Sequence, residues 1–284
     1  MKFFIIYLLA VGVLFSAEKS CETDSIQNTK TKSSMERWLD GNFGLKPHKV
    51  NYILPYAYRS DAYQSYVSSI TYSNIEAELQ VSLKLQIAND LLGLNEKYYL
   101  AYTQQAFWQL YIDSAPFRES LYNPEAFLEF PIRDSDSFFG LRSLIVGYAH
   151  KSNGQPNTEN IPDVRGNLSR SVNYIYTTLR MQHKTLVTDI TLWVPISDLD
   201  DNPDLMEYSG YSSLKFTYFL NGHMFTLMGR GNFETLNGAV EGTYSYPLIK
   251  DTNLYIKVFS GYGESLIDYN NKLTKYSIGF SFSR

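Results

Sequence analysis

A histidine and a serine two residues apart could form the reactive pair of an ester hydrolase. His150 and Ser152 have the same parity along the chain, and residues two apart on a strand lie roughly 6.5–7 Å from each other, within reach of a contact between imidazole and hydroxyl. A serine that attacks an ester needs a base, and the base needs a third group to hold its other ring nitrogen. Asn173 is the candidate, because antiparallel pairing of the next segment would bring it opposite His150. The alternative is a solvated histidine at a loop edge.

The segment that ends in this pair alternates with a period of two, as a strand does. Leu144, Val146 and Tyr148 share the parity of His150 and Ser152, whereas the other parity holds smaller or charged residues. We therefore expect the reactive pair on the apolar, outward face of a strand. A histidine and a serine at the end of such an apolar face are unusual there, which favours a functional role for the pair.

The same alternation recurs along the chain and predicts an all-β protein. Beyond residue 17 no uncharged apolar run approaches the roughly 18 residues that a membrane helix needs. Twelve segments show strand periodicity, at residues 49–58, 74–87, 97–111, 124–134, 140–150, 171–182, 185–194, 211–220, 223–232, 235–247, 251–262 and 273–282.

The connections between these segments alternate in length. Those after the odd-numbered segments are roughly 10 to 20 residues long, with one short exception near Asn232, whereas those after the even-numbered segments span roughly 2 to 9 residues. Short turns at one end, long loops at the other and an even strand count are typical of membrane barrels. The sequence therefore predicts a twelve-stranded antiparallel transmembrane β-barrel. A soluble β-sandwich is the alternative, but it would not sort its loops in this order.

The composition agrees with a barrel whose wall faces lipid. Of the 284 residues 15% are aromatic, including 24 Tyr, and only 19% are charged, against about 25% in a typical soluble domain. Tyrosine and tryptophan suit the two membrane interfaces, although tyrosine also favours strands in general. A net charge of -4 gives no basic surface for nucleic acid. The single cysteine, Cys21, excludes an intramolecular disulfide.

The first residues have the layout of a secretory signal peptide. A basic start at Met1-Lys2, an apolar run from residue 3 to 15 and the small residues Ser16-Ala17 predict a leader over residues 1–17, with an N-terminal anchor helix as the alternative. Residues 18–47 are polar and form an expected N-terminal segment. We expect residues 48–284 to form the barrel.

An acidic stretch resembles a calcium loop but lacks its fixed positions. Asp198, Asp200, Asn202 and Asp204 are spaced two residues apart, like the ligands of a calcium loop. Pro203, however, stands at the required glycine and Ser209 at the bidentate glutamate. We expect an outer acidic loop here.

Several blocks of sequence together resemble the calcium-dependent outer-membrane phospholipases A of Gram-negative bacteria. The blocks extend over about residues 100–270 and comprise Trp108-Gln109-Leu110, Pro116-Phe117-Arg118-Glu119, Gly147 to Gly154, Ser169 to Asn173, Asp201 to Asp204 and Tyr262 to Asn270. The fold of that family is a twelve-stranded barrel, which agrees with the strand count made from alternation.

The resemblance implies a role for each site residue. It makes Ser152 the nucleophile, His150 the general base and then acid, and Asn173 the residue that orients the imidazole. It places the oxyanion hole at the backbone N–H of Gly154, helped by a calcium-bound water. The implied calcium ligands are the carbonyl of Gln155, the hydroxyl of Ser169 and, from a partner subunit, Ser114; Gln104 matches a polar residue of the dimer face.

Two classes of function follow from these observations. The first is a bacterial outer-membrane phospholipase that hydrolyses acyl esters of membrane phospholipid through His150, Ser152 and Asn173, depends on Ca²⁺, acts as a calcium-linked homodimer and faces the outer leaflet. The second is a non-catalytic outer-membrane barrel, a porin or structural protein. The inward-facing residues discriminate between them, because a porin needs an open polar lumen.

Overall fold

The computed structural model describes residue 33 and residues 44–132 and 140–283. The chain divides into two compact units, Met1–Gly44 and Leu45–Arg284. The predicted leader at residues 1–17, Cys21 and most of the polar segment at 18–47 lie outside the described residues. In the part that is described, no helix is long and apolar enough to cross a bilayer.

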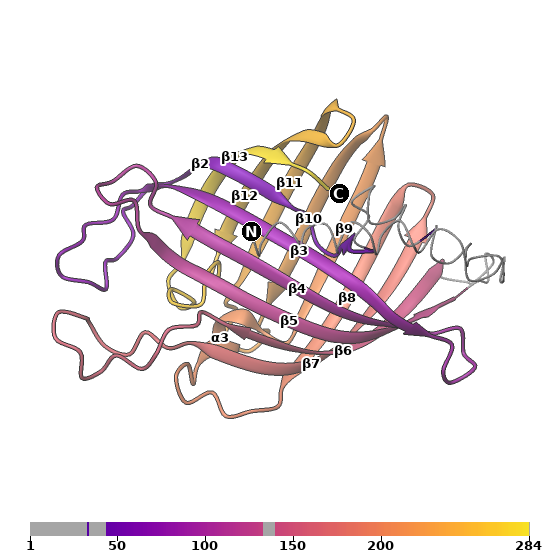
Figure 1. Cartoon of the computed structure of the whole chain (residues 1–284), viewed down its shortest axis with the longest axis horizontal. Helices are drawn as coiled ribbons and strands as arrows, with labels where there is room; N and C mark the ends of the chain where they lie inside the picture. The colour runs from indigo at the N-terminus through magenta and orange to yellow at the C-terminus, as the bar shows by residue number, and fades with distance from the viewer. Residues whose placement is uncertain (1–32, 34–43, 133–139, 284) are drawn as a thin grey trace, which may run out of the picture. The chain divides into compact units, whose positions relative to one another are not determined.

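The second unit contains twelve long strands, β2 to β13, that form one closed antiparallel sheet. Each strand pairs with the next along the chain, and β13 pairs with β2 to complete the ring. The strands are β2 (Tyr52–Arg59), β3 (Ile75–Asn89), β4 (Lys97–Trp108), β5 (Phe117–Pro131), β6 (Leu141–Ser152), β7 (Ser171–His183), β8 (Leu186–Pro195), β9 (Ser212–Leu220), β10 (His223–Gly231), β11 (Gly238–Ile249), β12 (Thr252–Gly261) and β13 (Leu273–Ser281). The predicted all-β, twelve-stranded antiparallel barrel is confirmed, and Figure 1 shows the strands in order.

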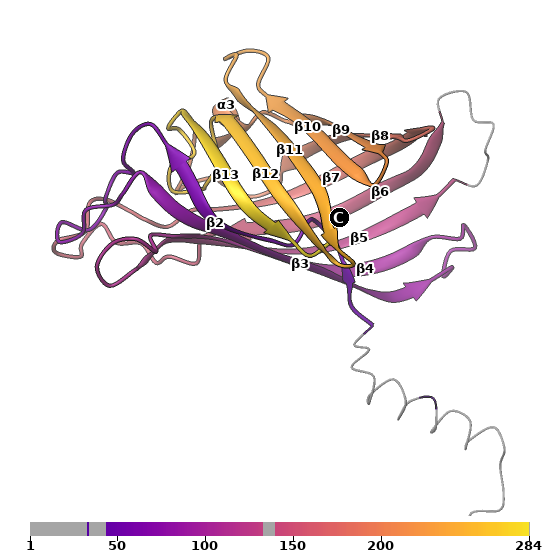
Figure 2. The same cartoon turned by 90° about the horizontal axis from the view of Figure 1, so that it is seen from above.

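Two short elements accompany the barrel. The two-residue strand β1 (Lys46–Pro47) pairs with β3 at Leu83 and Lys84, beyond Gln80, the partner of the first residue of β2. The helix α3 (Leu205–Ser209) lies in the connection between β8 and β9, as Figure 2 shows. The prediction of twelve strands contained neither element.

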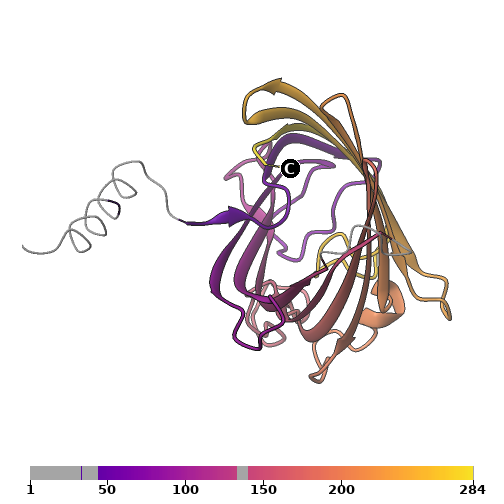
Figure 3. The same ribbon diagram turned by 90° about the vertical axis from the view of Figure 1, so that its right-hand side faces the viewer.

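The closed ring leaves each strand with one outward and one inward face. On β11, the outward residue Val240 is 53% exposed, whereas Thr243, which has the inward parity, is 8% exposed. Closure pairs the backbone groups of all twelve strands, which a wall immersed in lipid requires because lipid offers no hydrogen bonds. Figure 3 shows the strands enclosing an interior.

The two ends of the barrel differ in loop length. The connections 60–74, 109–116, 153–170, 196–211, 232–237 and 262–272 leave one end, and the connection 90–96 and the tight turns 184–185, 221–222 and 250–251 leave the other. At one of the tight turns Asn221 and Gly222 have φ values of 48° and 82°, the positive angles that a type I′ hairpin requires. The asymmetry agrees with the pattern expected of membrane barrels.

The interior of the barrel is filled by ion pairs rather than open. Lys275 Nζ lies 3.4 Å from a carboxylate oxygen of Glu76 and 3.0 Å from one of Glu78, and it also contacts Glu264. The guanidinium of Arg118 lies 3.0 Å from Glu76. These charged side chains are almost fully buried, and such burial is tolerable only because each charge is paired.

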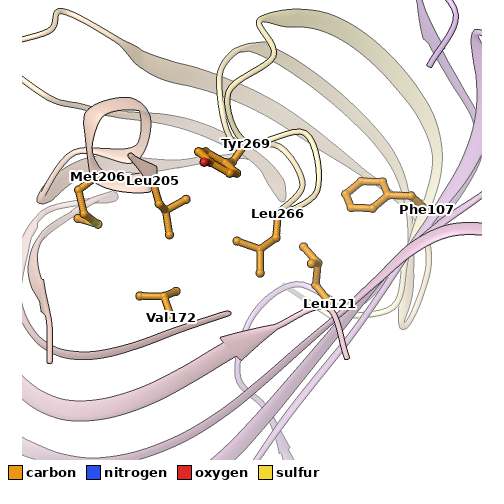
Figure 4. Close-up of a cluster of buried hydrophobic side chains, with 7 residues drawn as sticks. All are labelled: Phe107, Leu121, Val172, Leu205, Met206, Leu266 and Tyr269. Carbon is orange, nitrogen blue, oxygen red and sulfur yellow. The ribbon is translucent and has the colours of Figure 1, made fainter. Parts of the chain in front are cut away.

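Apolar side chains close the interior at the end with the long loops. The cluster draws on β4, β5, β7, α3 and the connection between β12 and β13, so segments far apart in the chain meet there. It comprises Phe107, Leu121, Val172, Leu205, Met206, Leu266 and Tyr269 (Figure 4). Burial raises the pKa of the Tyr269 phenol, which therefore stays protonated and donates to Asp204. The cluster packs directly behind the strand that carries Asn173.

One predicted strand begins too late. Alternation placed the fourth segment at 124–134, but β5 begins at Phe117 and ends at Pro131. The reason is that Arg118 and Glu119 are consecutive and both buried, next to a register shift at Phe107/Trp108 in the pairing of β4 with β5. A bulge of this kind interrupts strict alternation.

Candidate active site

His150 and Asn173 meet as register partners on β6 and β7. The pairing places their Cα atoms opposite each other, and imidazole Nδ1 lies 2.9 Å from the side-chain oxygen Oδ1 of Asn173. Both side chains share the outward parity of Val146 and Ile175, which are 43% and 50% exposed. The contact predicted from parity and antiparallel pairing is therefore present in the structure, and it lies on the outer wall.

The strand on the other side of β6 also shapes this position. The register of β5 with β6 brings Pro124 opposite His150, and the ladder is interrupted there because proline has no N–H to donate. The side chain of the preceding residue replaces that donor, since Asn123 Nδ2 donates to the carbonyl of His150 at 2.9 Å. The backbone of His150 is thus held from both sides.

Ser152 is the last residue of β6 and has the same outward parity as His150. Its register partners are Tyr122 on β5 and Ser171 on β7. Among the residues that the structure describes, no hydrogen bond joins its hydroxyl to His150. Catalytic hydrogen bonds are often long in unliganded enzymes.

The turn after Ser152 is fixed by the buried side chain of Asn153. Its Oδ1 accepts from the backbone N–H groups of Gln155 at 3.2 Å and Arg170 at 3.1 Å, and its Nδ2 donates to the carbonyl of Leu168 at 2.8 Å. Gly154 follows with φ = 65°, the left-handed region that favours glycine. A Cβ atom at this position would lie 2.8 Å from the ring of Tyr122, so both backbone and space require glycine.

The residues predicted to bind calcium lie in two connections. Gln155 and Ser169 belong to the β6–β7 connection, where Asn153 links their neighbourhoods by the bonds just described. The hydroxyl of Ser169 donates to Asp201 Oδ2 at 2.7 Å, and Asn167 donates to Asp201 Oδ1 at 2.6 Å. In the described ranges no group of three or more His, Cys, Asp or Glu side chains could hold a metal; the predicted ligands are carbonyl and hydroxyl oxygens instead.

Ser114 lies apart from these two, in the β4–β5 connection. It is exposed, with φ = 62°. The indole of Trp108 donates to the carbonyl of Ala115 at 2.6 Å and stacks on Phe117 at 5.3 Å. Within one chain no contact joins Ser114 to Gln155 or Ser169 among the described residues.

Gln104 lies on the outward face of β4. Its neighbours with the same parity are Leu100 and Tyr102, 49% and 42% exposed, and Tyr102 donates to Gln104 Oε1 at 3.3 Å. A half-buried side-chain amide therefore lies on an otherwise apolar wall.

Sequence reasoning assigned no role to four residues that the structure brings to this site. Tyr148 donates to Asn173 Oδ1 at 2.8 Å, and Asn173 Nδ2 donates to Ser197 at 3.1 Å. Asn202 accepts from the backbone N–H of Ser171 at 3.0 Å, and Asp201 holds Ser169. Shared parity with His150 was a usable signal for Tyr148. The other three belong to the acidic connection after β8, which no periodicity places beside β7.

Comparison with known proteins identifies the family. The sequence model of a family described as Phospholipase A1 matches residues 28–282. The chain belongs to the phospholipase A1 family. The resemblance stated from the sequence is thereby confirmed.

Relatives within the phospholipase A1 family cover most of the chain. The phospholipase A1 of Salmonella typhimurium is 36% identical over 246 residues, which are 84% of this chain and 82% of the relative. The phospholipase A1 of Proteus vulgaris is 34% identical and covers 96% of both chains.

Solved structures of the family have the same fold. The outer membrane phospholipase A of Escherichia coli superposes with a TM-score of 0.77 at 35% identity, covering 86% of this chain and 93% of that one. The outer membrane phospholipase of Salmonella typhi, described as a dimer with bound calcium, gives a TM-score of 0.77 at 36% identity, covering 85% and 93%.

Proposed function

We propose that this member of the phospholipase A1 family hydrolyses acyl esters of membrane phospholipid with Ser152 as nucleophile, His150 as base and Asn173 as the orienting residue. One observation carries the proposal. The imidazole of His150 is bonded to Asn173 on the lipid-facing wall, two residues from a serine of the same parity. Substrate reaches such a site from the side, out of the bilayer itself.

The hydrogen bond to Asn173 selects the tautomer that the reaction needs. With Nδ1–H donated to Oδ1, the free lone pair lies on Nε2, which takes the proton of Ser152 as the hydroxyl attacks the ester carbonyl. The same proton passes to the leaving alcohol when the tetrahedral intermediate collapses, and water repeats the sequence to release the fatty acid. A neutral amide in this role brings no charge onto the apolar wall.

The backbone N–H of Gly154 is the proposed donor to the oxyanion. It follows the nucleophile by two residues, in a turn that Asn153 fixes in place. Donors that are already oriented stabilise the developing charge without reorganising during the reaction.

The oxygen atoms around the β6–β7 connection fit a hard cation. Calcium prefers carbonyl, hydroxyl and carboxylate oxygens; Gln155 is an exposed residue there, and the hydroxyl of Ser169 lies against the carboxylate of Asp201. The proposed ligands in this chain are Gln155 and Ser169, with Ser114 contributed from a second copy. When bound there, calcium would add positive charge beside the oxyanion.

A second copy of the chain completes this site in the proposal. Ser114 is exposed and lies in a different connection from Gln155 and Ser169, and Gln104 presents an amide on the same outer wall. Hydrogen bonds between side-chain amides within a membrane favour association modestly. The relative whose structure is a dimer with bound calcium supports the same arrangement.

A porin is the other candidate, and the interior argues against it. A twelve-stranded porin would need an open, water-filled lumen. In this barrel Lys275, Glu76 and Arg118 are completely or almost completely buried in ion pairs, and the apolar cluster of Figure 4 lies at the end with the long loops. A filled interior suits a rigid support for residues on the outside.

The barrel belongs to the outer membrane, as do its structural relatives. Long loops are the extracellular ones in such barrels, and Ser152 is at the end with the long loops. We therefore assign the site to the outer leaflet, residues 1–17 to a cleaved signal peptide, 18–47 to a polar N-terminal segment and 48–284 to the barrel. Mass spectrometry of the mature protein tests the cleavage.

The experiment that tests the function measures fatty acid released from phospholipid in mixed detergent micelles with calcium. Wild type is compared with Ser152→Ala and with Ser260→Ala, an outer-wall serine of β12 whose hydroxyl lies 2.9 Å from that of Thr274. We expect Ser152→Ala to lose activity by a factor on the order of 10³ or more and Ser260→Ala to retain it. Unchanged hydrolysis by Ser152→Ala overturns the assignment of the nucleophile.

A further inference from the structure

The amide of Asn173 is held by three side chains, and one of them is an unassigned tyrosine. Oδ1 accepts from Tyr148 at 2.8 Å and lies 2.9 Å from His150 Nδ1. On the other side, Nδ2 donates to Ser197 at 3.1 Å. The backbone carbonyl of Asn173 also accepts from the N–H of Ile196 at 2.9 Å, so the main chain is fixed as well.

We propose that Tyr148 is a positioning residue for the hydrolysis, because its phenol holds the amide of Asn173 with the oxygen toward His150. This inference rests on the proposed function and deepens it. Tyr148 contacts neither the nucleophile nor the ester, and it acts through Asn173 alone.

The amide of an asparagine can adopt two orientations, which exchange its oxygen and its nitrogen. With Oδ1 toward the imidazole, Nδ1 carries the proton and Nε2 is free to act as base. With the amide turned over, Nδ2 would donate to Nδ1, the proton would reside on Nε2, and the imidazole could not accept a proton from Ser152. The choice between the two orientations therefore decides whether the site is active.

A phenol biases this choice toward the active orientation. Its O–H is a better donor than its oxygen is an acceptor, so Tyr148 favours a carbonyl oxygen over an amide N–H as its partner. Ser197 cannot make the same selection, because a serine hydroxyl donates or accepts with equal ease.

The position of Tyr148 on the outer wall also favours Asn173 as the partner of its hydroxyl. Its side chain is 43% exposed on the lipid-facing side, where a phenol O–H finds few partners in hydrocarbon. Among the described residues its hydrogen-bond partner is Asn173. The register that pairs Tyr148 with Ile175 and His150 with Asn173 keeps the phenol and the imidazole on the same side of β6, one above the other.

The first test compares Tyr148→Phe with wild type in mixed micelles containing calcium. Loss of one neutral hydrogen bond predicts a fall in kcat of about two- to tenfold, with KM unchanged because the phenyl ring still fills its place on the wall. The matched control is Tyr276→Phe, since Tyr276 is 55% exposed on the outer face of β13 and its hydroxyl bonds to none of the described residues. We expect the control to keep the wild-type kcat.

A double-mutant cycle tests whether Tyr148 acts through Asn173. In an Asn173→Ala background there is no amide to orient, so Tyr148→Phe should change kcat by less than about twofold. An equal fall in kcat in both backgrounds would overturn the proposal, because it would place the effect of Tyr148 elsewhere.

The tautomer of His150, measured by ¹⁵N spectroscopy, distinguishes a positioning role of Tyr148 from a purely structural one. The chain has four histidines, so ¹⁵N-labelled His150 can be assigned by comparison with His150→Gln. We expect wild type to hold the Nδ1–H tautomer and Tyr148→Phe to gain the Nε2–H tautomer; an unchanged tautomer ratio together with an unchanged kcat refutes the inference. Ser152→Ala is measured alongside. If Ser152→Ala remains active, the proposed function has failed; if it is inactive and Tyr148→Phe resembles wild type, this inference alone has failed.

Discussion

His150 and Asn173 are register partners on adjacent strands, with imidazole Nδ1 2.9 Å from the amide oxygen. The pair lies on the outer wall, at the end of the barrel from which the long connections leave. The strand pairing itself sets this contact, since each residue is bonded through its backbone into the same sheet.

Replacing Asn173 with alanine should leave the base in place but unoriented. We expect kcat for phospholipid hydrolysis to fall roughly ten- to a hundredfold, because a misplaced catalytic group costs about that much. Thermal unfolding should change little, since the side chain is on the outer surface and surface substitutions cost about 0.5 kcal/mol or less. Loss of the folded barrel in the variant would contradict a purely catalytic role.

Gly154→Ala should impair turnover because of where its methyl group would lie. The new Cβ would approach the ring of Tyr122 to 2.8 Å, and the backbone is left-handed. We expect kcat to fall by a factor on the order of ten to a hundred as the N–H moves away from the oxyanion. Gly166→Ala is the matched control: its φ is 74° and a Cβ there meets nothing within 4 Å. Equal losses in both variants would show that backbone strain alone is responsible.

Ser169→Ala should raise the calcium concentration that supports half-maximal hydrolysis. The variant removes one oxygen ligand and leaves the fold, so activity should recover at higher calcium; we expect a shift of about tenfold, the scale of one charge-assisted contact. Gln155→Ala is the control, because only the backbone carbonyl of that residue is proposed as a ligand. Titration of activity with buffered calcium measures both, and a shift in Gln155→Ala alone would reverse the assignment.

Gln104→Ala should weaken dimerisation in detergent without disrupting the barrel. Buried polar contacts between membrane segments contribute about 0.6 kcal/mol on average, which predicts a roughly threefold increase in the dimer dissociation constant. Sedimentation equilibrium with calcium and after chelation measures the change. Gln182→Ala serves as the control, because Gln182 lies on β7 beside the tight turn 184–185, at the end of the barrel away from the long loops. A wild-type dimer that is indifferent to chelation would contradict the shared calcium site.

Lys275→Met should destabilise the barrel strongly. The substitution leaves Glu76, Glu78 and Glu264 buried without the cation that contacts all three, and an uncompensated buried charge costs about 3–5 kcal/mol. Lys250→Met, in the exposed turn between β11 and β12, should have little effect. Urea unfolding in detergent compares the two variants, and equal stability would show that water reaches the carboxylates.

Alternation along the sequence was enough to predict the strands, because one lipid-facing and one inward face repeat in all twelve. It failed where the environment changes within a strand: Arg118 and Glu119 are both buried, which hid the start of β5. The helix α3 was missed because only five residues form it, too few for a helical period to appear.

In the candidate site too, some contacts were predicted from the sequence and others were not. Parity and the order of the strands predicted the contact of His150 with Asn173, since neighbours in sequence are neighbours in the sheet. They could not predict that Ser197, Asp201 and Asn202 reach β7 and its preceding connection, because an irregular connection has no period to read. Lys275 and Glu76 likewise meet inside the barrel although they are far apart in the chain, because β13 and β3 both pair with β2.

The proposed reactive pair, on the outside of a filled barrel, would change what controls the rate of hydrolysis. Substrate would arrive at such a site by lateral diffusion within one leaflet, so turnover would follow the mole fraction of phospholipid in that leaflet rather than its amount per volume of medium. Fatty acid and lysophospholipid would remain in the same two-dimensional fluid after cleavage, because the interior offers them no aqueous exit. A leaflet poor in phospholipid would therefore keep the enzyme idle without any inhibitor.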